Sequence, residues 1–178
     1  MTDIVKKDKI VAFFHQHIVP IYFCFEKEDT KNEFIVTSFV LSVSDYWFLI
    51  TAGHWFYGIR QELLNKGWKL AKCSLIDFLG IDATFKEPIP FPFDIKKSFF
   101  FPEIDNGDYS YDYGVYPLSG YFKEALMSNN IEPLNEEVWK KQPEHVDISA
   151  LLGIPSELKR ALSRKQISHS ILGAISSL

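Results

Sequence analysis

The chain has 178 residues and a formal net charge of −4, and 47% of its residues are hydrophobic while 16% are aromatic. This composition excludes a disordered chain, and the sixteen phenylalanines are enough to build a sizeable core. Because no block of lysine and arginine is present, we expect no nucleic-acid partner. No apolar stretch reaches the roughly eighteen residues of a membrane span, so we expect no membrane partner either.

The two cysteines, Cys24 and Cys73, lie far apart in the sequence and lack the spacing of metal ligands. Such lone cysteines favour reduced, buried thiols, and the sequence leaves a disulfide between them open. The N-terminus does not resemble a secretory signal, because polar residues interrupt the apolar run 10–14 and no small-residue cleavage site follows. We therefore expect a cytoplasmic protein with no metal and no other cofactor.

The N-terminal part of the chain predicts a short helix that leads into β-strands. Residues 2–17 have a loose helical periodicity, and they include His15 and His17. Two histidines without a nearby third ligand favour packing roles over a zinc site. The stretch 18–26 is typical of a first strand, and the charged stretch 26–33 predicts a hairpin loop.

Two further strands are predicted at 34–43 and 47–51, and Ser44 and Asp45 between them are typical turn residues. The second strand runs into the corner Thr51-Ala52-Gly53-His54. A histidine at the end of a buried hairpin is held by rigid walls while its ring reaches solvent. This is the placement that a general base needs.

The segment after His54 predicts a short helix that ends at Gly67. An apolar stripe at helical spacing supports this prediction, formed by Trp55, Phe56, Ile59 and Leu63. Residues 68–79 predict a strand or a pair of strands. The stretch 86–101 contains three prolines, which exclude a central strand and favour an extended surface segment.

A second candidate for acid–base chemistry is Asp112, which opens the predicted strand 111–118. A carboxylate at the mouth of an apolar strand can be shielded from water and accept the Nδ1 proton of a histidine, which fixes the tautomer of the ring. The neighbouring acids Asp105 and Asp108 lack the spacing of an EF-hand, so a calcium site is disfavoured.

Taken together, the two motifs resemble those of the trypsin-like serine peptidases. In that family the histidine motif is usually T-A-A-H, and the catalytic residues follow in the order His, Asp, Ser. Here the sequence has T-A-G-H at His54, and Asp112 begins a segment similar to the family's D-[apolar]-A-[apolar]-x-x-L, with Gly114 in place of the alanine.

This resemblance implies an all-β, antiparallel fold, a trypsin-like double β-barrel within a single domain 1–178. The first barrel, 18–118, would carry the His and Asp motifs and be largely complete. Residues 119–178 would form a linker and a truncated second barrel, with a helical turn at 122–127 and a strand at 146–154. Short helices are expected near the N-terminus, after His54 and near the C-terminus, the last at 156–166.

The nucleophile of the family is missing from the sequence. It sits in a G-x-S-G turn, whose glycines let the backbone curl and present N–H donors to the oxyanion, and neither G-x-S-G nor G-x-C-G occurs here. Ser156 follows Gly153-Ile154-Pro155, which resembles the strand end before the family's nucleophile turn, but no glycine follows and helix formers do. Cys73 lies between His54 and Asp112, out of order for a nucleophile.

We therefore expect a trypsin-like serine endopeptidase domain in which His54 is the acid–base residue and Asp112 orients it. The serine would lie beyond residue 178, so the chain would be an inactive N-terminal fragment. The alternative is a non-catalytic pseudo-protease that acts as a binding module. Both hypotheses expect a polypeptide substrate or protein partner and leave the oligomeric state open. A coincidental match in an unrelated small β-barrel would be established by finding His54 and Asp112 far apart.

Overall fold

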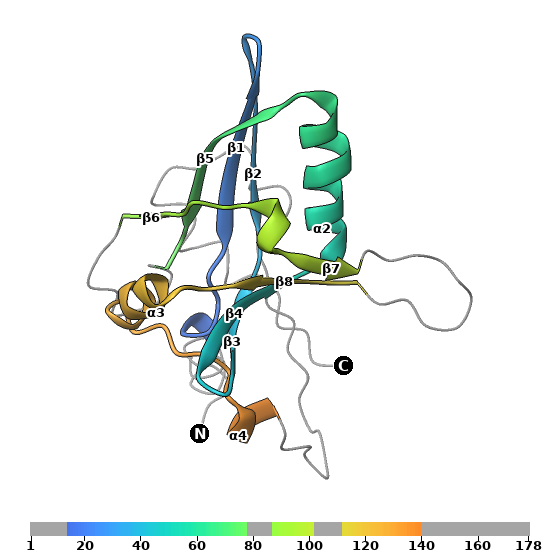
Figure 1. Ribbon diagram of the computed structural model, residues 1–178. Helices are drawn as coiled ribbons and strands as arrows, with labels where there is room; N and C mark the ends of the chain where they lie inside the picture. Colours follow the sequence, from blue (N-terminus) through green and yellow to red (C-terminus); the bar gives the residue numbers. More distant parts are fainter. Residues whose placement is uncertain (1–13, 78–86, 102–111, 140–178) are drawn as a thin grey trace, which may run out of the picture.

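The computed structural model describes residues 14–77, 87–101 and 112–139. This part of the chain is mostly β, with two antiparallel four-stranded sheets and a few short helices (Figure 1). The first sheet has the order β2 (Thr30–Val36), β1 (Ile21–Lys27), β5 (Lys69–Leu75) and β6 (Ile89–Pro90). The second has the order β3 (Phe39–Val43), β4 (Tyr46–Thr51), β8 (Tyr113–Pro117) and β7 (Phe99–Phe101).

Helical segments connect and cover these sheets. The helix predicted after His54 is present as α2 (Gly53–Gly58), and it continues through a π-helical turn (Ile59–Leu63) and a 3-10 turn (Leu64–Lys66). As predicted, Gly67 ends it, in the left-handed conformation with φ 84°. Further helical segments in the described residues are a 3-10 turn (Ile95–Lys97), α3 (Gly120–Met127) and α4 (Glu136–Trp139). None of the helices in the described residues is long and apolar enough to cross a bilayer.

Two of the predicted boundaries were wrong. The stretch 34–43 is not one strand, because the chain leaves the first sheet after β2 and enters the second sheet at β3. The predicted hairpin loop 26–33 is mostly paired strand, and its turn is only Glu28–Asp29. Backbone pairing continues to the tip because the charged side chains there point to solvent, where Glu26 and Lys31 form an ion pair at 2.8 Å.

Other predicted elements are confirmed. The Ser44–Asp45 turn joins β3 to β4, and both residues have positive φ (48° and 65°), as a two-residue hairpin turn requires. The proline-rich stretch contributes β6 and β7, which are edge strands and not central ones. Cys24 and Cys73 are buried free thiols.

The sheets described here do not close into a barrel, so they support an all-β, antiparallel fold without establishing the family's double barrel. In the region expected to begin a second barrel, residues 119–139 contain α3 and α4. Of the range 2–17, where a short helix was predicted, only residues 14–17 are described, and residues 14–15 are helical. The strand predicted at 146–154 and the helix predicted at 156–166 lie outside the described residues.

The core is rich in aromatic side chains. Phe23 and Phe25 of β1 pack against Phe34 of β2, with ring centroids 5.4 and 6.0 Å from that of Phe34. The predicted stripe of α2 docks onto this core through Phe56 and through Ile59 of the following turn, both buried. Anchoring by a buried aromatic ring fixes α2 against the sheets, which matters because α2 carries His54.

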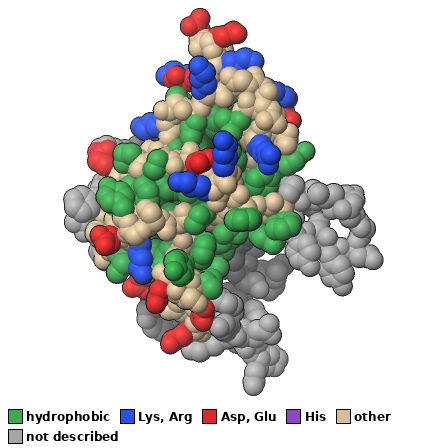
Figure 2. Space-filling view, viewed as in Figure 1, with side chains coloured by type: hydrophobic (Ala, Val, Ile, Leu, Met, Phe, Trp, Pro, Cys, Tyr) green, Lys and Arg blue, Asp and Glu red, His purple; other side chains and the backbone are tan. Residues whose placement is uncertain are grey.

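The surface combines charges of both signs with hydrophobic side chains (Figure 2). Phe99 and Phe101 of the edge strand β7 are among the exposed hydrophobic residues. This strand pairs with β8, and both strands contact α2. The start of α2, the end of β7 and the start of β8 therefore meet at one corner of the second sheet.

Candidate acid–base site

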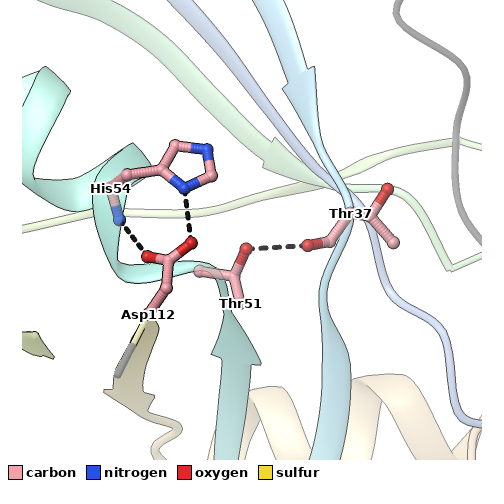
Figure 3. A network of polar contacts seen from close by, with 4 residues as sticks. All are labelled: Thr37, Thr51, His54 and Asp112. Atoms are coloured by element: carbon pink, nitrogen blue, oxygen red, sulfur yellow. Dashed lines mark hydrogen bonds and ion pairs between the residues drawn. The ribbon is translucent and has the colours of Figure 1, made fainter. Parts of the chain in front are cut away.

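The position of His54 follows from the way β4 passes into α2. Thr51 is the last residue of β4, Ala52 is extended (φ −70°, ψ 135°), and α2 begins at Gly53. The hydroxyl of Thr51 donates a hydrogen bond to the backbone carbonyl of Thr37 at 2.7 Å, which ties the end of β4 to the junction between β2 and β3 (Figure 3). His54 thus projects from the first turn of a helix whose start is held in place.

Asp112 reaches the same corner from the other direction. It directly precedes β8, which pairs antiparallel with β4 so that Thr51 lies opposite Gly114. Antiparallel pairing brings the end of one strand beside the start of its neighbour, and this places Asp112 next to His54 although 58 positions separate them in sequence.

The two residues are joined by two hydrogen bonds. The Nδ1 atom of His54 lies 2.6 Å from Oδ2 of Asp112, and the backbone N–H of His54 donates to Oδ1 at 2.8 Å (Figure 3). A carboxylate can only accept, so Nδ1 of His54 carries the proton of this bond. In the neutral ring the lone pair is then on Nε2, and the His54 side chain is 55% exposed.

The electrostatics of Asp112 favour its ionised form. Partial burial, which leaves 26% of the side chain exposed, on its own raises the pKa of the carboxyl. The hydrogen bonds from the ring and the amide of His54, with smaller contributions from the charge of His54 and the amide of Gly53, outweigh burial and lower the pKa below its ordinary value. Asp112 is therefore a carboxylate at neutral pH, able to stabilise a positive charge on the ring.

A hollow of about 570 Å³ borders Asp112. Its lining is mostly apolar and includes Phe39, Ile50 and Tyr113, while the hydroxyl-bearing residues Thr37 and Thr51 supply polar groups. The hollow gives one side of the site a concave, largely apolar wall of the kind that receives a ligand or another polypeptide segment.

Of the other residues weighed from the sequence, His17 lines the hollow, whereas Cys73 and His15 are not among its lining residues. Cys73 is buried in the core, and burial raises the pKa of its thiol, which leaves it protonated and unreactive. His17 donates from Nδ1 to the carbonyl of Glu132 at 2.7 Å, and His15 is also buried. Ser156 lies outside the described residues. In the described ranges, no three His, Cys, Asp or Glu side chains are arranged to hold a metal ion.

Sequence reasoning identified His54 and Asp112 but missed the groups that support them. The hydrogen bond from the Thr51 hydroxyl to the Thr37 carbonyl joins residues 14 positions apart, so no local sequence pattern indicates it. The contribution of the Gly53 amide to Asp112 was equally hidden, although Gly53 was visible as a small residue in the T-A-G-H corner. The chain matches no protein-family model, no curated protein and no solved structure.

Proposed function

We propose that His54 and Asp112 are the acid–base pair of a trypsin-like serine endopeptidase domain. The observation that carries this proposal is that Asp112 accepts hydrogen bonds from both Nδ1 and the backbone N–H of His54, while more than half of the His54 side chain stays exposed. The two bonds hold the ring in one tautomer and one orientation.

In the proposed reaction, Nε2 of His54 takes the proton from a serine hydroxyl as its oxygen attacks the peptide carbonyl. The imidazolium then gives that proton to the leaving amine. Asp112 remains ionised throughout and stabilises the positive charge on the ring. General acid–base assistance of this kind contributes about 10²–10⁴-fold to the rate.

The nucleophile is not assigned to any residue. The sequence contains no G-x-S-G turn, which would supply both the attacking serine and the donors for the oxyanion. This absence favours a second candidate function, a non-catalytic binding module that keeps the His–Asp pair and the adjoining hollow and binds a polypeptide without cleaving it.

The first assay follows hydrolysis of an activated ester, p-nitrophenyl acetate, by the full 178-residue chain, because an exposed imidazole can act on this substrate without a separate serine. We expect the rate to fall to the solvent background in His54→Gln and to fall in Asp112→Asn. The matched control is Asp45→Asn, which makes the same change in an exposed hairpin turn and should leave the rate unchanged. Equal rates in the unaltered chain and His54→Gln would contradict the proposal.

The second assay uses a quenched fluorescent protein substrate and separates the two candidate functions. Peptide hydrolysis that disappears in His54→Ala supports the endopeptidase. Ester hydrolysis that depends on His54, without any peptide hydrolysis, is expected both of a fragment that lacks the serine and of the binding module, and binding of the uncleaved polypeptide by the chain then favours the binding module. Peptide hydrolysis that survives His54→Ala rules out His54 as the acid–base residue.

A further inference from the structure

The start of α2 lies against the backbone of two neighbouring strands. A Cβ atom built on Gly53 would lie 2.2 Å from the carbonyl oxygen of Phe101 in β7 and 2.6 Å from that of Tyr113 in β8. Phe101 and Tyr113 are themselves a paired position of the sheet. Because both obstacles are backbone atoms, rotation of a side chain cannot relieve the contact.

This contact lies directly beside the His–Asp pair. Gly53 precedes His54, and Tyr113 follows Asp112, so the close approach of residues 53 and 113 is next to the bond between residues 54 and 112. Heavy atoms that are not bonded prefer to lie about 3.5–4.0 Å apart. A methyl group on Gly53 would therefore push α2 and β8 apart by roughly 1 Å, enough to break a hydrogen bond of 2.6 Å.

A second glycine makes a matching contact between β8 and α2, at a residue three positions further along the helix. A Cβ atom on Gly114 would lie 2.6 Å from Cδ2 and 2.9 Å from Cε2 of Phe56. The ring of Phe56 is fully buried and packs against Phe93 and Phe100, with centroid distances of 5.6 and 6.3 Å, so it has little room to move aside.

We infer that Gly53 and Gly114 are positioning residues that let α2 sit close enough to β8 for His54 to reach Asp112. Because of these contacts, changing either glycine to alanine in this chain should separate the pair. Any catalytic role of the two glycines rests on the proposed function. Their effect on the hydrogen bond between His54 and Asp112 can be measured without substrate.

The experiment records the Nδ1–H proton resonances of the full chain labelled with ¹⁵N-histidine. His54 should give a low-field signal from its bond to Asp112, identified by its loss in Asp112→Ala. His17 supplies an internal reference, because its buried Nδ1–H donates to the carbonyl of Glu132 at 2.7 Å. We expect Gly53→Ala to lose the His54 signal and to keep the His17 signal. The matched control is Gly58→Ala in the same helix, where a Cβ would meet no atom within 4 Å and both signals should remain.

A Gly53→Ala chain that keeps both signals overturns the inference. If that variant does not fold, Gly114→Ala decides: we expect it to lose the His54 signal, and Phe56→Leu added to it should restore the signal by making room. Retention of the signal in Gly114→Ala would overturn the inference. An unaltered chain without the His54 signal overturns it as well, whereas a signal without His54-dependent ester hydrolysis sinks only the proposed function.

Discussion

His54 and His17 are held at the same ring atom in two different regions of the molecule. In each, Nδ1 donates a short hydrogen bond, of 2.6 Å to Asp112 and of 2.7 Å to the carbonyl of Glu132. The partner of His54 is charged and its side chain is more than half exposed. The partner of His17 is neutral, and His17 is buried with Nε2 3.1 Å from the side-chain nitrogen of Gln16.

The comparison shows that a hydrogen bond at Nδ1 does not by itself make a site for proton transfer. A reacting ring also needs an accessible Nε2 and a partner that stabilises the imidazolium. His54 meets both conditions. His17 meets neither, and its bonds instead join the segment before β1 to the segment after α3, where the Glu132 amide also donates to the carbonyl of Gln16 at 2.8 Å. His54 is thus placed for proton transfer, whereas His17 links two segments of the fold.

The largest effect is expected when the charged partner of His54 is made neutral. Because the chain has no G-x-S-G nucleophile turn, the readout is the His54-dependent hydrolysis of p-nitrophenyl acetate, which Asp112→Asn should slow by about 10²–10⁴-fold, the scale of general acid–base assistance. The amide can donate to Nδ1, which moves the ring proton to Nε2 and removes the base. Steady-state kinetics would measure this loss. A loss of less than tenfold would mean that Asp112 does not set the tautomer.

Chemical modification should be about 100-fold faster at His54 than at His17. Diethylpyrocarbonate reacts with an unprotonated imidazole nitrogen, which His54 exposes. His17 must first open from the fold, and an opening free energy of about 3 kcal/mol slows a reaction by roughly this factor. Peptide mapping by mass spectrometry after timed exposure measures both rates, and in denaturant the two should become equal. Similar rates in the folded chain would show that the environment of His17 is open.

The free energy of unfolding should depend more on His17 than on His54, which is the reverse of the order expected for their rates of modification. His17→Ala removes a buried ring together with its hydrogen bond to the carbonyl of Glu132, so we expect a loss of about 2–3 kcal/mol in the free energy of unfolding. His54→Ala breaks a bond between an exposed ring and a partly exposed carboxylate and should cost less than about 1 kcal/mol. Urea unfolding followed by tryptophan fluorescence gives both values. A larger loss in His54→Ala would contradict this assignment of roles.

The sequence was informative about local features and uninformative about how they pack. His54 and Asp112 stood out because each occupies a strand end in a recognisable motif, and the structure brings them into contact. The break between β2 and β3 at Thr37 could not be predicted, since an unbroken run of strand-forming residues contains no turn signal and the change of sheet depends on distant partners. Gly53 was visible only as a small residue, because its close approach is to backbone atoms of β7 and β8.

Asp112 and Asp77 are carboxylates in contrasting environments, and their contributions to stability should depend on pH in opposite directions. Asp77 is fully buried, and burial raises the pKa of its carboxyl, although the Asn129 side chain donates to Oδ2 at 2.6 Å and partly offsets this. The Oδ1 atom of Asp77 has no hydrogen-bond partner in the described part of the chain. The pKa of Asp112 is lowered, so its contribution to stability is present above its unfolded pKa and is lost as the pH falls through the lower folded value.

For Asp77 the sign is reversed. A raised folded pKa means that its contribution is fully present below the unfolded pKa of about 3.9 and is lost as the pH rises through the folded value. Asp77→Asn keeps an oxygen to accept from Asn129 and removes the ionisation, so the variant should gain stability relative to the unaltered chain as the pH rises above about 4. Urea unfolding of both chains from pH 4 to pH 8 measures the difference in their free energies of unfolding. Asp112→Asn should not reproduce this pH dependence, because the contribution of Asp112 changes only near and below pH 4. A difference that stays constant over this range would mean that Asp77 titrates alike in the folded and unfolded chains.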